Sequence, residues 1–81
     1  MRLDKFLKVS RVIKRRTVAG NACKAGRVTV NGRDAKAGKQ IDVGDEVTIE
    51  FGSGILKFRI LKVCETISKD DASTMYEVLE G

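Results

Sequence analysis

Arginine and lysine side chains are concentrated in the first half of this sequence, and they are its most conspicuous chemical groups. Residues 1–39 contain twelve of them against two acids, whereas residues 40–81 contain four bases and nine acids. The formal net charge of the whole chain is +5. So uneven a distribution indicates one face that meets a polyanion and another that meets water or a different partner.

The basic residues are suited to binding nucleic-acid phosphates. A guanidinium group is a planar fork of donors that can bridge two phosphate oxygens, whereas a lysine ammonium acts as a point charge. Four arginines fall where two short helices are expected to meet, three lysines lie among them, and two more arginines flank a predicted hairpin. The candidate RNA-binding residues are Arg2, Lys5, Lys8, Arg11, Lys14, Arg15, Arg16, Arg27 and Arg33.

The remaining residues give little support for catalysis or metal binding. The chain has no histidine and two cysteines, Cys23 and Cys64, which are too few for the set of about four close ligands that zinc requires. Both cysteines lie beside apolar residues, which predicts reduced, buried thiols in a cytosolic protein. No pairing of a nucleophile with a base can be assembled. We therefore expect no catalytic residue, metal, cofactor or small-molecule substrate.

The length and hydropathy of the chain limit its organisation. A chain of 81 residues suits one domain, which buries only ~60% of the surface of its unfolded form. The sequence is charged from Arg2 onward, and its longest apolar runs are two or three residues. We therefore expect neither a signal peptide nor a membrane span, and a cytoplasmic location. A monomer is the default expectation.

A helix is predicted from Leu3 to about Val12. Its apolar positions recur at i, i+3, i+4 and i+7, which defines one buried face, and basic residues three apart form a separate stripe. Asp4 falls in the first turn, where its charge suits the helix dipole and where it can pair with Lys8. We expect Asp4 to act on the structure rather than on a ligand.

A second helix is predicted to follow the basic bend at residues 13–16 and to end at about Ala25. Val18, Ala22 and Ala25 mark its expected inner face. Gly26 is expected to adopt the left-handed conformation that terminates many helices. Two short helices joined by a tight basic bend should pack as a helical hairpin.

Strands and turns are predicted for the rest of the chain. Val28–Val30 followed by Asn31-Gly32 is a strong hairpin signal, and polar–apolar alternation predicts strands over residues 46–51, about 56–64 and 75–79. Phe51 and Phe58 are expected in the core. The fold class is α+β, with two short N-terminal helices packed on a small, mostly antiparallel sheet of four to five strands. We expect a single domain over residues 1–81, with a core motif at about 1–51 and C-terminal strands at 55–81.

Three motifs in a fixed order resemble a known family. Arg2-Leu3-Asp4 opens the first helix, Arg16 stands early in the second, and the hairpin reads Gly26-Arg27-Val28-Thr29-Val30-Asn31-Gly32. In this order and spacing they resemble the S-four-type RNA-binding domain over roughly residues 1–51. The resemblance implies that Arg2 and Arg16 are the chief RNA contacts.

Because the resemblance covers most of the chain, it points to the standalone members of this family. The sequence looks most like the group that acts in ribosome-associated quality control in Firmicutes, and it is similar to the fifteen-kilodalton heat-shock proteins. The resemblance implies binding to rRNA of large ribosomal subunits that are obstructed by peptidyl-tRNA. It also implies an RqcH-type tailing factor as a partner, which extends the stalled nascent chain at its C-terminus.

Two other functions remain open on the sequence. An adaptor would bind a partner protein through the acidic second half, and a helix-turn-helix protein would bind DNA, although no clear recognition helix follows the basic first helix. The small number of aromatic residues favours recognition of helical RNA by shape and phosphates over stacking on unpaired bases. The acids on which the adaptor would depend are Glu46, Glu50, Asp70, Asp71, Glu77 and Glu80.

Overall fold

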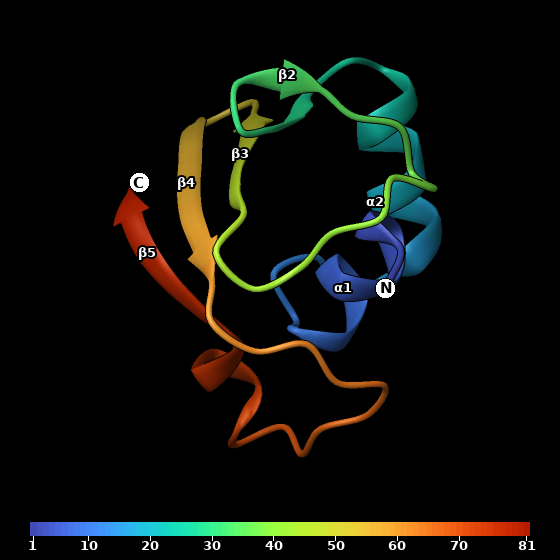
Figure 1. Cartoon of the computed structure of the whole chain (residues 1–81). Helices are drawn as coiled ribbons and strands as arrows, with labels where there is room; N and C mark the ends of the chain where they lie inside the picture. The colour runs from blue at the N-terminus through green and yellow to red at the C-terminus, as the bar shows by residue number, and fades with distance from the viewer.

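Two short helices lie against one face of a five-stranded antiparallel sheet (Figure 1). The computed structural model describes all residues from 1 to 81, and it confirms the predicted fold class. The strand order across the sheet is β2-β1-β3-β4-β5. The elements are α1 (Leu3–Val9), α2 (Arg16–Lys24), β1 (Val28–Val30), β2 (Arg33–Asp34), β3 (Glu46–Phe51), β4 (Gly54–Ile60), the 3-10 helix η1 (Ala72–Met75) and β5 (Tyr76–Glu80). Neither α-helix is long and apolar enough to cross a membrane.

Helix α1 ends at Val9, earlier than the predicted end at about Val12. The cause is Arg11, whose φ of 62° is a left-handed conformation that a right-handed helix cannot contain. The amide of Ile13 donates instead to the carbonyl of Leu7, which turns the chain toward α2. The predicted buried face is correct, since Leu3, Phe6, Leu7 and Ser10 are all buried.

Helix α2 buries a different stripe from the predicted one. Ala19 and Cys23 are buried, whereas Val18 is 50% exposed and Ala25 is exposed. The prediction was wrong because the apolar residues of α2 form a broad arc that runs from Ala25 and Val18 to Ala19 and Cys23, so periodicity alone does not select which part of it faces the core. Gly26 has the expected positive φ, 75°, directly after the helix.

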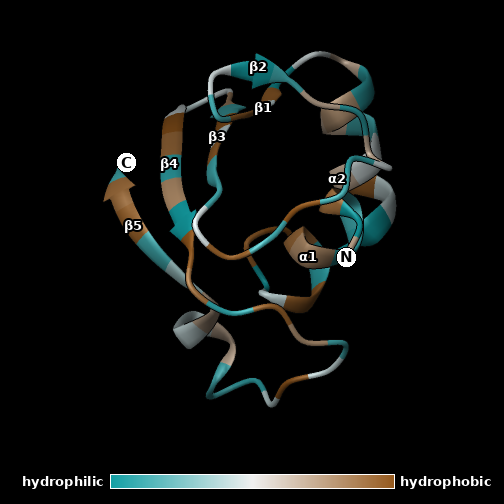
Figure 2. Ribbon diagram, viewed as in Figure 1, coloured by the Kyte–Doolittle hydropathy of each residue, from teal (hydrophilic) through white to brown (hydrophobic).

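The sheet follows the predicted strands with one shortened element. Asn31 and Gly32 have φ values of 52° and 82°, as a two-residue hairpin turn requires. Strand β4 ends at Ile60 rather than near residue 64, and residues 61–71 leave the sheet and pass beside α1 (Figure 1). Figure 2 shows β2, at one edge of the sheet, as hydrophilic, and both of its residues are exposed.

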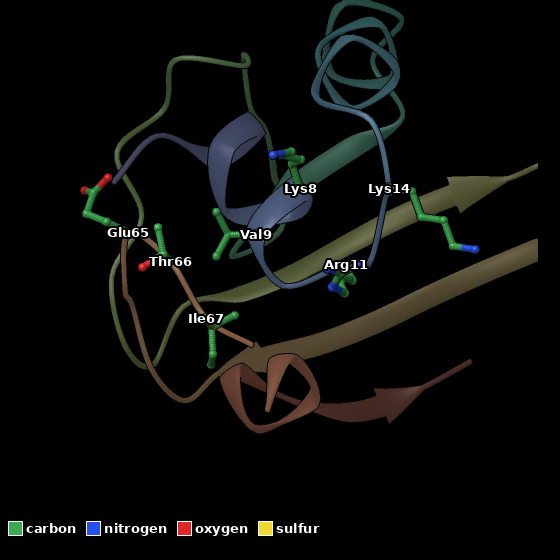
Figure 3. Close-up of a pocket in the computed structure, with 7 residues that line it drawn as sticks. All are labelled: Lys8, Val9, Arg11, Lys14, Glu65, Thr66 and Ile67. Carbon is green, nitrogen blue, oxygen red and sulfur yellow. The ribbon is translucent and has the colours of Figure 1, made fainter. Parts of the chain in front are cut away.

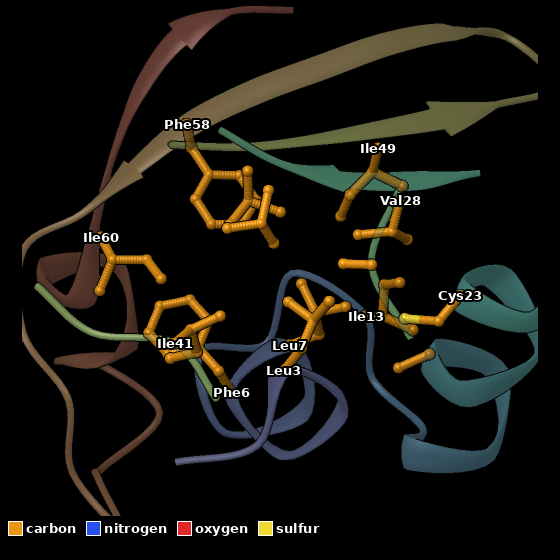
Figure 4. Packing of buried hydrophobic residues seen from close by; sticks show 14 of the residues in the cluster. Leu3, Phe6, Leu7, Ile13, Cys23, Val28, Ile41, Ile49, Phe58 and Ile60 are labelled. Carbon is orange, nitrogen blue, oxygen red and sulfur yellow. The ribbon is translucent and has the colours of Figure 1, made fainter. Parts of the chain in front are cut away.

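The core lies between the helices and the inner face of the sheet (Figure 4). The ring of Phe58 stacks on that of Phe6 at 6.1 Å and meets that of Tyr76 edge-on at 5.3 Å. Phe51, which was predicted in the core, is 40% exposed. It is the last residue of β3, where the sheet opens into a groove beside α2.

The loss of unfolding free energy when Ile49 is shortened tests how tightly this core is packed. Ile49 is 1% exposed on β3, and Ile55, on the neighbouring strand β4, is 53% exposed. Ile49→Val should lower the free energy of unfolding by about 1 kcal/mol because it removes a buried methyl group. The matched change Ile55→Val should cost less than about 0.5 kcal/mol. Urea denaturation measures both, and equal losses would contradict the assignment of Ile49 to the core.

Candidate nucleic-acid interface

The carboxylate of Asp4 holds two arginines together at the surface. Its Oδ1 accepts hydrogen bonds from the Nε of Arg2 at 3.3 Å and from the backbone amide of Lys5 at 2.8 Å. Its Oδ2 accepts from the Nη2 of Arg2 and from the Nε of Arg16, both at 3.3 Å. The predicted pairing of Asp4 with Lys8 is wrong, because both oxygens of the carboxylate are already occupied by these partners.

Pairing with Asp4 leaves Arg2 and Arg16 accessible. The carboxyl side chain is only 9% exposed, whereas the side chains of Arg2 and Arg16 are 51% and 47% exposed. Arg16 keeps both terminal nitrogens, and Arg2 keeps its Nη1, free of any protein partner. Two guanidinium groups share one negative charge, so a net positive charge remains. Their unpaired N–H groups are held in place and face the solvent, where they can donate hydrogen bonds to a ligand.

Residues 37–39, in the loop between β2 and β3, form hydrogen bonds with the first residues of α1. The amide of Leu3 donates to the carbonyl of Lys39 at 2.8 Å, and the amide of Asp4 donates to that of Ala37 at 3.1 Å. The guanidinium of Arg2 lies over Gly38, where a β-carbon would come within 3.8 Å of its Nη2. These contacts bring the backbone of Lys39 against the start of α1, while its side chain lines a hollow with Arg33. Lys39 is not among the residues predicted from the sequence to bind RNA, because no local pattern indicates a contact across 36 residues.

A second basic group lies at the C-terminal end of α1. Lys8, Arg11 and Lys14 line a hollow of about 190 Å³, whose other wall is formed by residues 65–67 (Figure 3). Lys14 extends away from the other labelled side chains in Figure 3, so the three cations do not converge on one point. Arg15 is exposed between this group and Arg16.

Lys5 differs from the other predicted contacts because an acid from the C-terminal half already binds it. Its ammonium group forms a salt bridge with the carboxylate of Glu65. The hydrogen bond from Lys5, and then its charge, lower the pKa of Glu65. The charge that Lys5 offers to a ligand is therefore partly neutralised.

The two arginines that flank the hairpin lie on different sides of the fold. Arg33 lines a hollow that it shares with Lys39, whereas Arg27 lines a groove on the flank of α2. Asn31, at the tip of the hairpin, is engaged structurally. Its amide nitrogen donates to Asp45 at 3.1 Å, and its side-chain oxygen accepts from the amide of Glu46 at 3.0 Å.

The outer face of the sheet neutralises its own charges. Glu46 pairs with Lys57 at 3.6 Å and with Arg59 at 3.3 Å, and Arg59 also pairs with Glu77 at 3.4 Å. This ladder engages two of the six acids on which an adaptor function would depend. Most predicted contacts on the helical side lack such a partner, so uncompensated positive charge remains there.

Comparisons with known proteins agree with the geometry. The sequence matches the S4 domain over residues 1–47, a segment that contains all nine predicted contacts. It is 58% identical, over 96% of this chain and 89% of the relative, to a Halalkalibacterium halodurans protein named RQC P-site tRNA stabilizing factor. It is 45% identical, over 99% and 93%, to the Bacillus subtilis protein of the same name. The structure resembles the trimeric structure of Vibrio cholerae heat shock protein 15, with a TM-score of 0.89, 30% identity, and coverage of 96% of this chain and 80% of that one.

Replacement of the buried carboxylate tests whether Asp4 organises the interface. Asp4→Asn keeps the size of the side chain but removes its charge, so Arg2 and Arg16 lose their common anchor. We expect the free energy of unfolding to fall by about 1–2 kcal/mol in urea, a figure reduced because both arginines are half exposed. Asp34→Asn is the control, since Asp34 is exposed and its carboxylate has no hydrogen-bond partner. Equal effects of the two substitutions would contradict the anchoring role.

The salt bridge between Lys5 and Glu65 should be visible in a pH titration. Because the pKa of Glu65 is lowered, the salt bridge is present at neutral pH and is lost as the pH falls through that pKa. In Lys5→Gln, the pKa of Glu65 should rise toward the ordinary range of glutamate. NMR titration of the Glu65 carboxyl measures this, and an unchanged midpoint would show that Lys5 is not the cause.

Proposed function

This chain belongs to the S4 domain family, and we propose that it stabilises tRNA in the P-site of obstructed large ribosomal subunits during ribosome-associated quality control. The two relatives that align over most of their length are named RQC P-site tRNA stabilizing factor. The chain docks on rRNA of the large subunit and holds peptidyl-tRNA in place while a stalled nascent chain is extended. The tailing factor, an RqcH-type protein, is its partner in that step.

The observation that carries this proposal is the pair of half-exposed guanidinium groups on Asp4. Both arginines are presented in one place before any ligand arrives, so little side-chain entropy is lost when they bind phosphate. The hollow lined by Lys8, Arg11 and Lys14 and the hollow shared by Arg33 and Lys39 add further positive charge. We assign RNA contact to all nine residues predicted from the sequence, and we add Lys39.

The mechanism is electrostatic docking without a chemical step. Each phosphate that the basic side chains neutralise releases condensed counterions, so the affinity should fall steeply as the salt concentration rises. The helical hairpin gives the surface a rigid shape that suits structured RNA. To stabilise a bound tRNA, the protein needs only contacts that persist, and it breaks or forms no covalent bond. Action on ribosomes places the protein in the cytoplasm.

Removal of either anchored arginine should weaken ribosome binding. We expect Arg2→Ala and Arg16→Ala each to cost about 1–3 kcal/mol in binding to purified large subunits, because each removes charge-assisted hydrogen bonds to phosphate. Each should also reduce the slope of log affinity against log salt by about one. Co-sedimentation at several salt concentrations measures both quantities, and circular dichroism checks the fold.

Arg59→Ala is the matched control for these two variants. It removes an arginine of similar exposure, 41%, from the outer face of the sheet, where Glu46 and Glu77 already neutralise it. Subunit binding should therefore be unchanged. If Arg59→Ala weakened binding as much as Arg16→Ala, the helical face would not be the RNA interface. Binding that resists ribonuclease would point to a protein partner instead.

A further inference from the structure

An apolar groove of about 340 Å³ lies between α2 and the end of β3, and of its lining residues only Arg27 belongs to the interface described above. One wall consists of Val18 and Ala22 from α2, and the other of Ile49 and Phe51 from β3. Val18 is 50% exposed and Phe51 is 40% exposed. The groove is therefore open to solvent along both walls, although its lining is largely hydrophobic.

Phe51 presents the most accessible aromatic ring in the chain. Phe6 and Phe58 are completely buried, and Tyr76 is half-buried against the ring of Phe58. Phe51 follows Val47 and Ile49 on the inner face of β3, but no helix covers this end of the strand. Single exposed apolar residues are common, but Phe51 and the half-exposed Val18 line one groove, and contiguous apolar surface of this kind marks binding sites.

One cation, Arg27, lines this groove and is exposed. The basic bend Lys14-Arg15-Arg16 adjoins the groove, because in the chain it joins Ile13 to Val18, which both line it. The side chains of the bend do not themselves line the groove. Arg27 forms no ion pair with Glu50, although the amide of Glu50 donates to the Arg27 carbonyl at 2.8 Å. The guanidinium group of Arg27 is therefore available to a ligand.

We propose that this groove binds one unstacked nucleobase of the RNA on which the protein docks. The base lies against the ring of Phe51, and the phosphates on its two sides face Arg27 and the basic bend. Aromatic rings bind unstacked bases of any sequence in this way. The amide of Asn21 and the carboxylate of Glu50, which also line the groove, can bond to the edge of the base. An apolar protein side chain would fill the groove but leave the guanidinium group of Arg27 without a counterpart.

This inference rests on the proposed function, because it requires the protein to bind RNA. It extends the interface to the flank of α2, the helix that also carries Arg16. It also changes the kind of RNA that the protein should prefer. A helical segment from which one nucleotide is extruded would satisfy both the phosphate contacts and the groove, whereas a fully paired helix would satisfy only the phosphates.

Two RNA hairpins of equal length test the proposal with the full chain. One carries a single bulged 2-aminopurine, and the other is fully paired. We expect Phe51→Leu to weaken binding of the bulged hairpin about tenfold and to leave the paired hairpin unaffected. The 2-aminopurine fluorescence should be quenched by the wild-type protein and much less by Phe51→Leu. Ile55→Ala, which trims an exposed apolar residue on the outer face of the sheet, is the control and should change neither affinity.

Phe51→Trp provides an independent readout. It keeps an aromatic face, so affinity for the bulged hairpin should persist, and the chain has no other tryptophan. Its indole emission should be quenched by the bulged hairpin and not by the paired one. If circular dichroism showed Phe51→Leu to be unfolded, this variant would carry the test by itself. Absence of selective quenching would overturn the proposal.

Other outcomes separate this inference from the proposed function. Unchanged or equally weakened binding of both hairpins by Phe51→Leu, together with sensitivity to Arg16→Ala, would overturn the inference and retain RNA binding. If Phe51→Leu weakened subunit binding but affected neither hairpin, the groove would hold a protein, and the inference would again be wrong. If the wild-type chain bound neither RNA nor subunits, the proposed function would fail and the inference with it.

Discussion

The arrangement of cations on the helical side depends on the hydrogen bonds that the carboxylate of Asp4 accepts from Arg2 and Arg16. Arg2 and Arg16 come from different helices and would repel each other if they met without a counter-charge. Burial of a carboxylate is unfavourable unless its oxygens are satisfied, and here two guanidinium groups and a backbone amide satisfy them. One buried acid therefore joins α1 to α2 and holds two half-exposed guanidinium groups in place.

The two faces of the sheet use charge in opposite ways. On the outer face, Arg59 lies between Glu46 and Glu77, so the charges compensate one another. On the helical side, Asp4 is shared by two arginines and most other cations have no acidic partner. Compensated charges contribute little to binding a polyanion, whereas uncompensated ones attract it over a distance. Uncompensated positive charge is thus confined to one side of the fold, without a strongly basic composition throughout the chain.

The residues beyond the S4 match are required to complete the motif. Ile49, Phe58 and Ile60 from β3 and β4 belong to the same buried cluster as Phe6 of α1, and the ring of Phe58 stacks on that of Phe6, so the helical hairpin has no closed core without them. Glu65 adds a contact at the surface by pairing with Lys5. The same sheet also leaves Phe51 beyond the cover of α2, which creates the groove. Strands β3 and β4 therefore complete the core under the helices, and β3 also forms one wall of the groove.

Local pattern in the sequence determined the fold class, the buried face of α1, the Asn31-Gly32 hairpin and the basic character of the first half, because each depends on neighbouring residues. Tertiary structure decided what depends on distant contacts. The periodicity of α2 fits several orientations, so only packing against α1 and β1 selected Ala19 and Cys23 for burial. Alternation along β3 placed Phe51 on the inner face, but whether a helix covers that face is a property of the assembled layers. The pairing of Asp4 with Arg16, and the contact of the Lys39 backbone with the start of α1, likewise required chain segments that meet only in the folded state.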